Sequence, residues 1–181
     1  MENSSNSVTK WAMTYGLYLG VFHIIFNVIL YLTNHLFNPG YYSYISTAVV
    51  IWITWSGLVK YRDGVNGGFM KYGQGLGLGV LISVFSGIFA AATMYIIMKF
   101  DGSLSDQMLD LMIEEVERSG LSGDMVDSME KMYKIMVSPG VVALSAYISK
   151  IFGGAFISLI VAAFVKKNPE NGFYDAVKDV E

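Results

Sequence analysis

The sequence predicts an all-α integral membrane protein with four transmembrane helices and an extracytoplasmic amphipathic helical hairpin between the third and the fourth. Of its 181 residues, 54% are hydrophobic and 15% are charged, which is too apolar for an ordinary soluble domain. Four apolar stretches approach the roughly 20 residues that a helix needs to cross a bilayer. A long hydrophilic segment separates the last two stretches. We therefore expect a single membrane domain over residues 1–181.

Four segments are predicted to span the bilayer, at about residues 11–32, 42–59, 72–98 and 141–165. The first resembles a signal peptide, but its apolar run has the length of a full span and no A-x-A-like cleavage site follows, so we expect it to be retained. The second is the shortest, and aromatic residues at both its ends are typical of a membrane interface. Residues 166–181 are expected to form a tail.

The distribution of lysine and arginine predicts the orientation. Seven of these residues lie at position 10, in the connection 60–71 and after residue 165, whereas the loop 33–40 has none. Cytoplasmic loops are enriched in basic residues. We therefore expect a multi-pass protein with both termini in the cytoplasm.

Residues 103–138 are predicted to form two amphipathic helices, and the segment 99–138 carries nine acidic and four basic residues. Methionine is flexible and polarizable, so a methionine-rich face can bind partners adaptably. The alternative is that the two apolar faces pack on each other and on the membrane surface. A thioether metal site is not expected, because the spacing is that of a helix core and no Cys or His stands nearby. The methionines are Met108, Met112, Met125, Met129, Met132 and Met136.

Small residues recur every fourth position on the third span, so one face of that helix is bare and another helix can approach it closely. We predict that this row packs helices within the bundle or against a partner. The row is Gly75, Gly79, Ser83, Gly87 and Ala91. Two further rows are Ala12, Gly16 and Gly20 on the first span, and Ser145, Ser149 and Gly153 on the fourth.

Three polar residues inside the spans form the candidate site: His23, Asn27 and Lys150. At 1.5 Å per residue, His23 lies roughly 13 Å and Lys150 roughly 15 Å from the outer ends of their helices, so the two can meet. All fifteen acidic residues fall outside the predicted spans. This argues against an ion-coupled transporter and favours an anionic guest such as a lipid phosphate. The alternative is that Lys150 snorkels to the interface and the other two bond to neighbouring helices.

Other functional classes find little support. The net charge of -3 and the pI of about 5.3 argue against nucleic-acid binding. No cysteine is present, and no nucleophile, base and metal-ligand constellation can be assembled. We therefore expect no enzyme activity, no metal and no cofactor.

Short motifs of glycine and aromatic residues lie before the third span: YR at 61–62, GGF at 67–69 and YGQ at 72–74. With the four-span layout and the hydrophilic excursion before the last span, they resemble a bacterial family of small inner-membrane proteins of unknown function, the DUF4199 type. The resemblance implies the fold, a bacterial origin and the inner (cytoplasmic) membrane. It supplies no catalytic residues.

Two functions follow from these features. The first is a non-enzymatic accessory or scaffolding subunit of a bacterial inner-membrane complex, which docks on another integral membrane protein or a second copy through its glycine-lined faces and the Met-rich hairpin. The alternative is a small lipid-linked carrier or flippase component, in which Lys150 and His23 hold an anionic headgroup of a membrane lipid.

Overall fold

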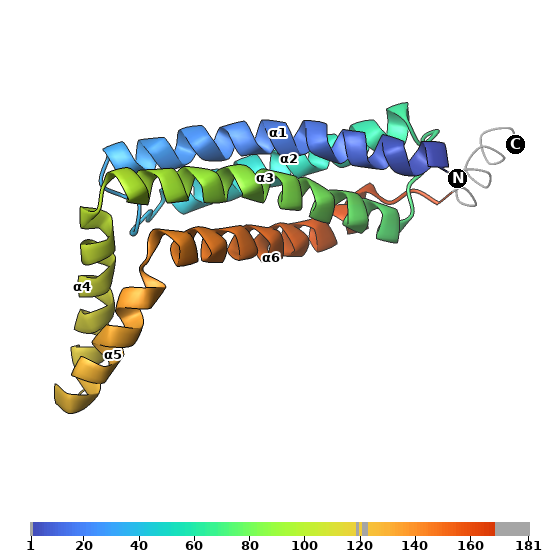
Figure 1. The fold of residues 1–181 in the computed structure, drawn as a ribbon. Coiled ribbons are helices and arrows are strands. Elements are labelled where there is room, and N and C mark those ends of the chain that lie inside the picture. Colours follow the sequence, from blue (N-terminus) through green and yellow to red (C-terminus); the bar gives the residue numbers. More distant parts are fainter. Residues whose placement is uncertain (1, 119, 121–122, 169–181) are drawn as a thin grey trace, which may run out of the picture.

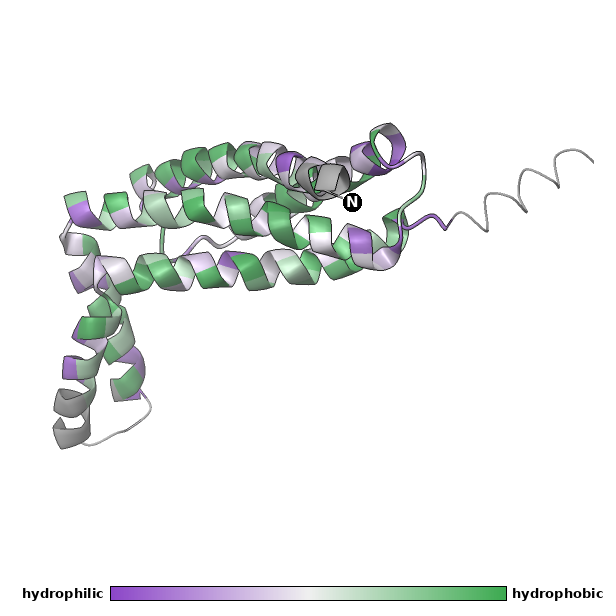
Figure 2. Cartoon of the chain, turned by 45° about the vertical axis from the view of Figure 1, so that its right-hand side comes forward, coloured by the Kyte–Doolittle hydropathy of each residue, from purple (hydrophilic) through white to green (hydrophobic). Residues whose placement is uncertain are grey.

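The computed structural model describes residues 2–118, 120 and 123–168, and within them every regular element is an α-helix (Figure 1). Four long helices run side by side as a bundle, and two shorter helices form a hairpin that projects sideways from one end of it (Figures 1 and 2). The long helices are α1 (Glu2–Leu32), α2 (Tyr42–Gly64), α3 (Tyr72–Phe100) and α6 (Pro139–Val165). The hairpin helices are α4 (Ser103–Arg118) and α5 (Gly123–Met136).

The four bundle helices are each long and apolar enough to cross a membrane, as the sequence predicted. Large apolar side chains on their outer surface remain exposed, such as Phe152, Phe156 and Phe164 on α6. Figure 2 shows apolar residues over much of the outside of these helices. A soluble monomer rarely exposes so much apolar surface. The fold is that of a multi-pass membrane protein.

Two helix boundaries differ from the prediction. The first helix begins at Glu2 rather than near residue 11, and the second ends at Gly64 rather than near residue 59. In both places the helix continues through polar residues beyond its apolar stretch. Nothing breaks it there, because the chain between Glu2 and Gly16 holds neither proline nor glycine, and the turn residues of the second connection come only after Asp63.

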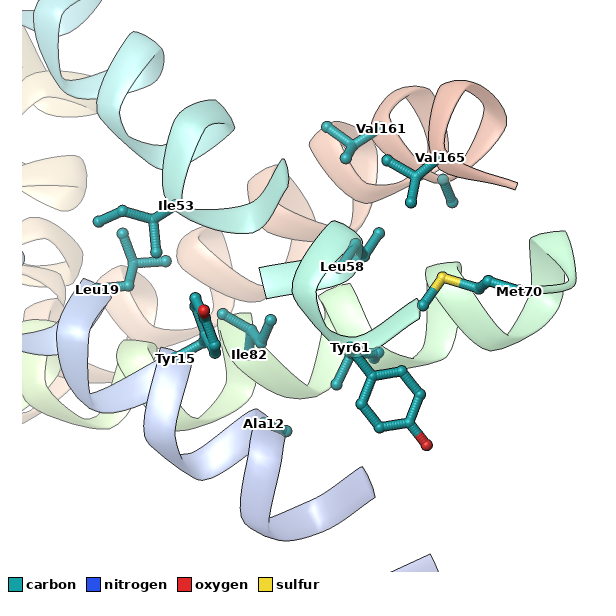
Figure 3. Packing of buried hydrophobic residues seen from close by; sticks show 12 residues of the cluster. Ala12, Tyr15, Leu19, Ile53, Leu58, Tyr61, Met70, Ile82, Val161 and Val165 are labelled. Atoms are coloured by element: carbon teal, nitrogen blue, oxygen red, sulfur yellow. The ribbon is translucent and has the colours of Figure 1, made fainter. Parts of the chain in front are cut away.

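Helix α3 lies between α1 and α6 (Figure 1), and the main cluster of buried side chains draws on all four bundle helices. At the end away from the hairpin, Tyr15 and Leu19 of α1 meet Ile53 of α2 and Ile82 of α3 (Figure 3). The indole Nε1 of Trp11 donates a hydrogen bond of 3.0 Å to the carbonyl of Gly57. These contacts fix α1 and α2 against the centre of the bundle.

The glycine row of α3 faces α6 within the same chain. A Cβ added at Gly75 would lie 3.2 Å from the Cβ of Ala162, and one added at Gly79 would overlap the side chain of Ser158, 2.7 Å from its Cβ. At Gly87 the added atom would lie 3.0 Å from the ring of Tyr147. The row is therefore an internal packing surface.

The row of α1 packs on the other side of α3. A Cβ at Gly16 would lie 2.6 Å from the Cβ of Phe85, and one at Gly20 would overlap the ring of Phe89, 2.7 Å from its Cγ. These close approaches need the absence of a side chain on α1. Both small-residue faces are thus covered by helices of the same chain.

On α6 the close contact lies one position further along the chain than the predicted row. The residues that meet α3 are Gly154, Ser158 and Ala162, whereas Ser145, Ser149 and Gly153 are exposed. The last member of the α3 row, Ala91, is half-buried beside an open apolar groove of about 370 Å³ between α3 and α6. Because successive helical residues are 100° apart, the row Ser145, Ser149 and Gly153 faces away from α3.

Hydrogen bonds close both ends of the bundle. Opposite the hairpin, Met70 and Lys167 exchange two backbone hydrogen bonds of 2.9 Å, and Arg62 donates to the carbonyl of Val165 at 3.0 Å. At the hairpin end, the Tyr31 hydroxyl donates to Asp101 at 3.0 Å. A second apolar cluster, formed by Ile97, Met98, Leu104 and Val142, ties the hairpin to the bundle.

Candidate functional site: a polar cavity inside the bundle

A cavity of about 230 Å³ lies among the four bundle helices, and all four contribute to its wall. It contains His23 of α1 and Lys150 of α6, two of the three polar residues that the sequence singled out. The lining residues are Leu19, His23, Ser46, Thr47, Val50, Ser83, Ser86, Ser149, Lys150, Gly153, Gly154 and Ile157.

His23 forms a deeply buried polar part of this wall. Its side chain is 2% exposed, and its Nδ1 atom has no hydrogen-bond partner among the described residues. Buried polar atoms in folded proteins are almost always hydrogen-bonded. The Nδ1 atom is itself buried in the wall, so among the described residues it is an exception to this rule.

Lys150 lines the same cavity from α6 and is half-buried. No aspartate or glutamate is among the lining residues. The described residues form three ion pairs, and none of them includes Lys150. The pairs are Arg62 with Asp63, Arg118 with Glu114, and Lys134 with Glu130. The ammonium group of Lys150 thus has no counter-charge from the described part of the chain.

Hydroxyl groups complete the wall. Ser83 donates to the carbonyl of Gly79 at 3.0 Å, and Ser86 donates to that of Ser83 at 3.2 Å, so both oxygens remain available as acceptors. The side-chain hydroxyls of Ser46 and Ser149 make no hydrogen bond to another described residue, so both can donate to a group in the cavity. The cavity therefore combines a positive charge with neutral donors and acceptors.

The cavity opens sideways between α2 and α6. Thr47 on α2 and Ser149 and Gly153 on α6 are exposed, whereas His23 and Ser83 are buried at the opposite wall. The mouth lies towards the hairpin end, because Thr47 is five residues from the start of α2, or about 7.5 Å along its axis. The opening therefore lies on the flank of the bundle.

The structure brings His23 and Lys150 together and leaves Asn27 outside the cavity wall. The serine and threonine residues of the wall were not singled out from the sequence. The sequence shows how many serine and threonine residues the spans contain. Which of them face inward depends on how each helix is rotated about its axis. That rotation follows from packing.

The methionines of the hairpin have different surroundings. Met108 packs on the apolar cluster at the hairpin end, Met112 and Met129 are half-buried, and Met132 and Met136 are exposed. The side chain of Met125 lies outside the described residues. In the part of the chain with described coordinates, no group of three or more His, Asp or Glu residues is placed to hold a metal ion.

Comparison with known proteins gives a family and no function. A family model described as "Protein of unknown function (DUF4199)" matches residues 14–167. No curated protein and no solved structure matches the chain. Because the family match covers most of the sequence, including α2, α3 and α6 in full and the larger part of α1, the chain belongs to the DUF4199 family of proteins of unknown function.

Proposed function

We propose that this protein binds the anionic headgroup of a membrane lipid in the cavity of its bundle and acts as a small lipid carrier or flippase component. The observation that carries the proposal is the meeting of Lys150 and His23 in one cavity whose wall has no carboxylate. An unpaired charge at membrane depth is costly. A bound anion removes that cost.

The size and chemistry of the cavity favour a phosphate group. A water molecule takes about 30 Å³ of liquid volume, so 230 Å³ holds a phosphate with a few waters and is too small for a whole lipid. Lysine binds phosphate as a point charge. The hydroxyls of Ser46 and Ser149 and the imidazole of His23 supply further hydrogen bonds.

The position of the mouth favours a lipid over a free anion. The opening between Thr47 and Ser149 faces the flank of the bundle, where the acyl chains of a lipid lie. A headgroup enters there while its chains stay outside against the apolar surface of α6. A water-soluble anion would need an opening at one end of the bundle.

The proposed location is the bacterial inner membrane, with both termini in the cytoplasm. The charge distribution supports this orientation, because basic residues gather at the bundle end opposite the hairpin. They are Lys60, Arg62, Lys71, Lys166 and Lys167. The mouth of the cavity then lies in the outer half of the membrane.

The test is the amount of anionic phospholipid that the purified protein retains, measured by native mass spectrometry. Replacing Lys150 with Met removes one charge-assisted hydrogen bond, worth about 1.5–3 kcal/mol, and should weaken binding about 10- to 100-fold. Lys131→Met, on the polar face of α5, removes the same charge outside the cavity and should retain the lipid. Equal retention in both variants, with unchanged elution in size-exclusion chromatography, refutes the proposal.

A second candidate is an accessory subunit, supported by one surface. Asp106, Asp110 and Glu114 are exposed at four-residue spacing on one face of α4, which fits a basic partner. The glycine rows are covered within the chain, so docking through them would require α6 or α1 to move away from α3. Purification from native membranes in mild detergent tests this candidate: a stoichiometric partner that is lost on Asp110→Lys supports it.

A further inference from the structure

Helix α5 carries a strip of apolar side chains that the described part of the chain leaves exposed. Met132, Ile135 and Met136 are 49%, 68% and 44% exposed. Their i, i+3, i+4 spacing places them on one side of the helix. Glu130 and Lys134, which form an ion pair of 2.7 Å, lie on the other side.

The hairpin runs crosswise to the bundle at one end of the four long helices (Figures 1 and 2). With the bundle helices placed along the membrane normal, as their length and apolar composition require of spans, the hairpin lies along the plane of the membrane at the level of its surface. A helix in that position with one apolar and one polar side buries the apolar side at the boundary between headgroups and acyl chains.

The exposed strip continues into the outer surface of α6. Only Val137 and Ser138 separate α5 from α6, and Val141 and Leu144 at the start of α6 are exposed as well. The junction is held in place, because the Ser105 hydroxyl donates to the carbonyl of Val137 at 3.2 Å. The strip of α5 is therefore next to the lipid-facing surface of the bundle.

We infer that α5 is a membrane-surface helix, and that the strip Met132, Ile135 and Met136 contacts the lipid of the outer leaflet while the acidic face of α4 faces the aqueous side. Apolar burial drives this contact. The segment 99–138 has more than twice as many acidic as basic residues, so anionic headgroups do not attract it. The inference concerns a lipid surface distinct from the cavity and does not depend on headgroup binding there.

The absence of cysteine from the chain permits a direct test with single nitroxide labels on the full-length protein in phosphatidylcholine vesicles. Met132→Cys places the label on the strip, and Lys134→Cys places it on the polar side of the same helix; both positions are exposed. Electron paramagnetic resonance then measures collisions of each label with oxygen, which partitions into lipid, and with a water-soluble nickel chelate.

The label at position 132 should show an oxygen-to-nickel accessibility ratio several-fold higher than the label at position 134. The same pattern is expected when Lys150→Met is added, which separates this inference from headgroup binding. High nickel accessibility at both positions would place the strip in water and overturn the inference. Protection of position 132 from both reagents would mean that protein, either a partner or a second copy, covers the strip, and would also overturn it.

Discussion

Replacing Gly79 with alanine tests the contact between α3 and α6 most sharply. The added Cβ would overlap the Ser158 side chain, 2.7 Å from its Cβ, so one helix must shift. Overpacking of this kind costs about 1–3 kcal/mol. For a protein of this size, each kcal/mol lowers the melting temperature by about 2–4 °C. We therefore expect a decrease of about 2–12 °C in detergent micelles.

The matched control is Gly77→Ala on the same helix. No atom lies within 4 Å of a Cβ added at Gly77, and alanine favours a helix by up to about 1 kcal/mol over glycine. This variant should melt at or slightly above the wild-type temperature. Thermal unfolding followed by fluorescence-detected size-exclusion chromatography measures both.

Ser158→Gly supplies the rescue, because it removes the side chain that the added Cβ meets. The double variant Gly79→Ala/Ser158→Gly should be more stable than the sum of the two single effects predicts, by about 1 kcal/mol or more. If Gly79→Ala and Gly77→Ala melt at the same temperature, the close packing of α3 on α6 is wrong. Additive effects in the double variant would likewise contradict the assigned contact.

Two further predictions concern the bundle ends. Hydrogen bonds from the hydroxyls of Ser103 and Tyr31 hold the pKa of Asp101 below its ordinary value, so this carboxylate stabilises the fold above about pH 4 and the contribution is lost as the pH falls further. Asp101→Asn should make the melting temperature fall less steeply as the pH decreases in the acid range. The same pH dependence in the variant and the wild type would contradict this. Arg62→Met removes the hydrogen bond to the carbonyl of Val165 and should lower the unfolding free energy by about 1 kcal/mol, measured by chemical denaturation; no change would show that this bond is not needed.

The sequence was sufficient to predict the four bundle helices and the hairpin, because apolar length and amphipathic spacing depend little on tertiary contacts. The small residues of α1 and α3 were also visible, since regular spacing puts them on one face. The helix start at Glu2 was not predicted. The helix continues through polar residues before the apolar stretch, and a hydropathy pattern does not detect a helix there.

The facing surfaces were harder to predict than the helices. A bundle helix such as α6 is apolar on nearly all sides, so its sequence does not fix which side meets α3, and the contact lies at Gly154 and Ser158 rather than at Gly153. The cavity illustrates the same point. Depth along the helices predicted that His23 and Lys150 can meet, whereas the position of Ser46 and Ser149 in the cavity wall depends on packing.

An experimental density map of the protein purified from native membranes would test headgroup binding most directly. We expect a compact density of the size of a phosphate within hydrogen-bonding distance of Lys150 and His23, continuous through the mouth between α2 and α6 with acyl-chain density outside. A cavity that holds only water, with the Lys150 side chain turned away towards the membrane surface, would contradict the proposed function.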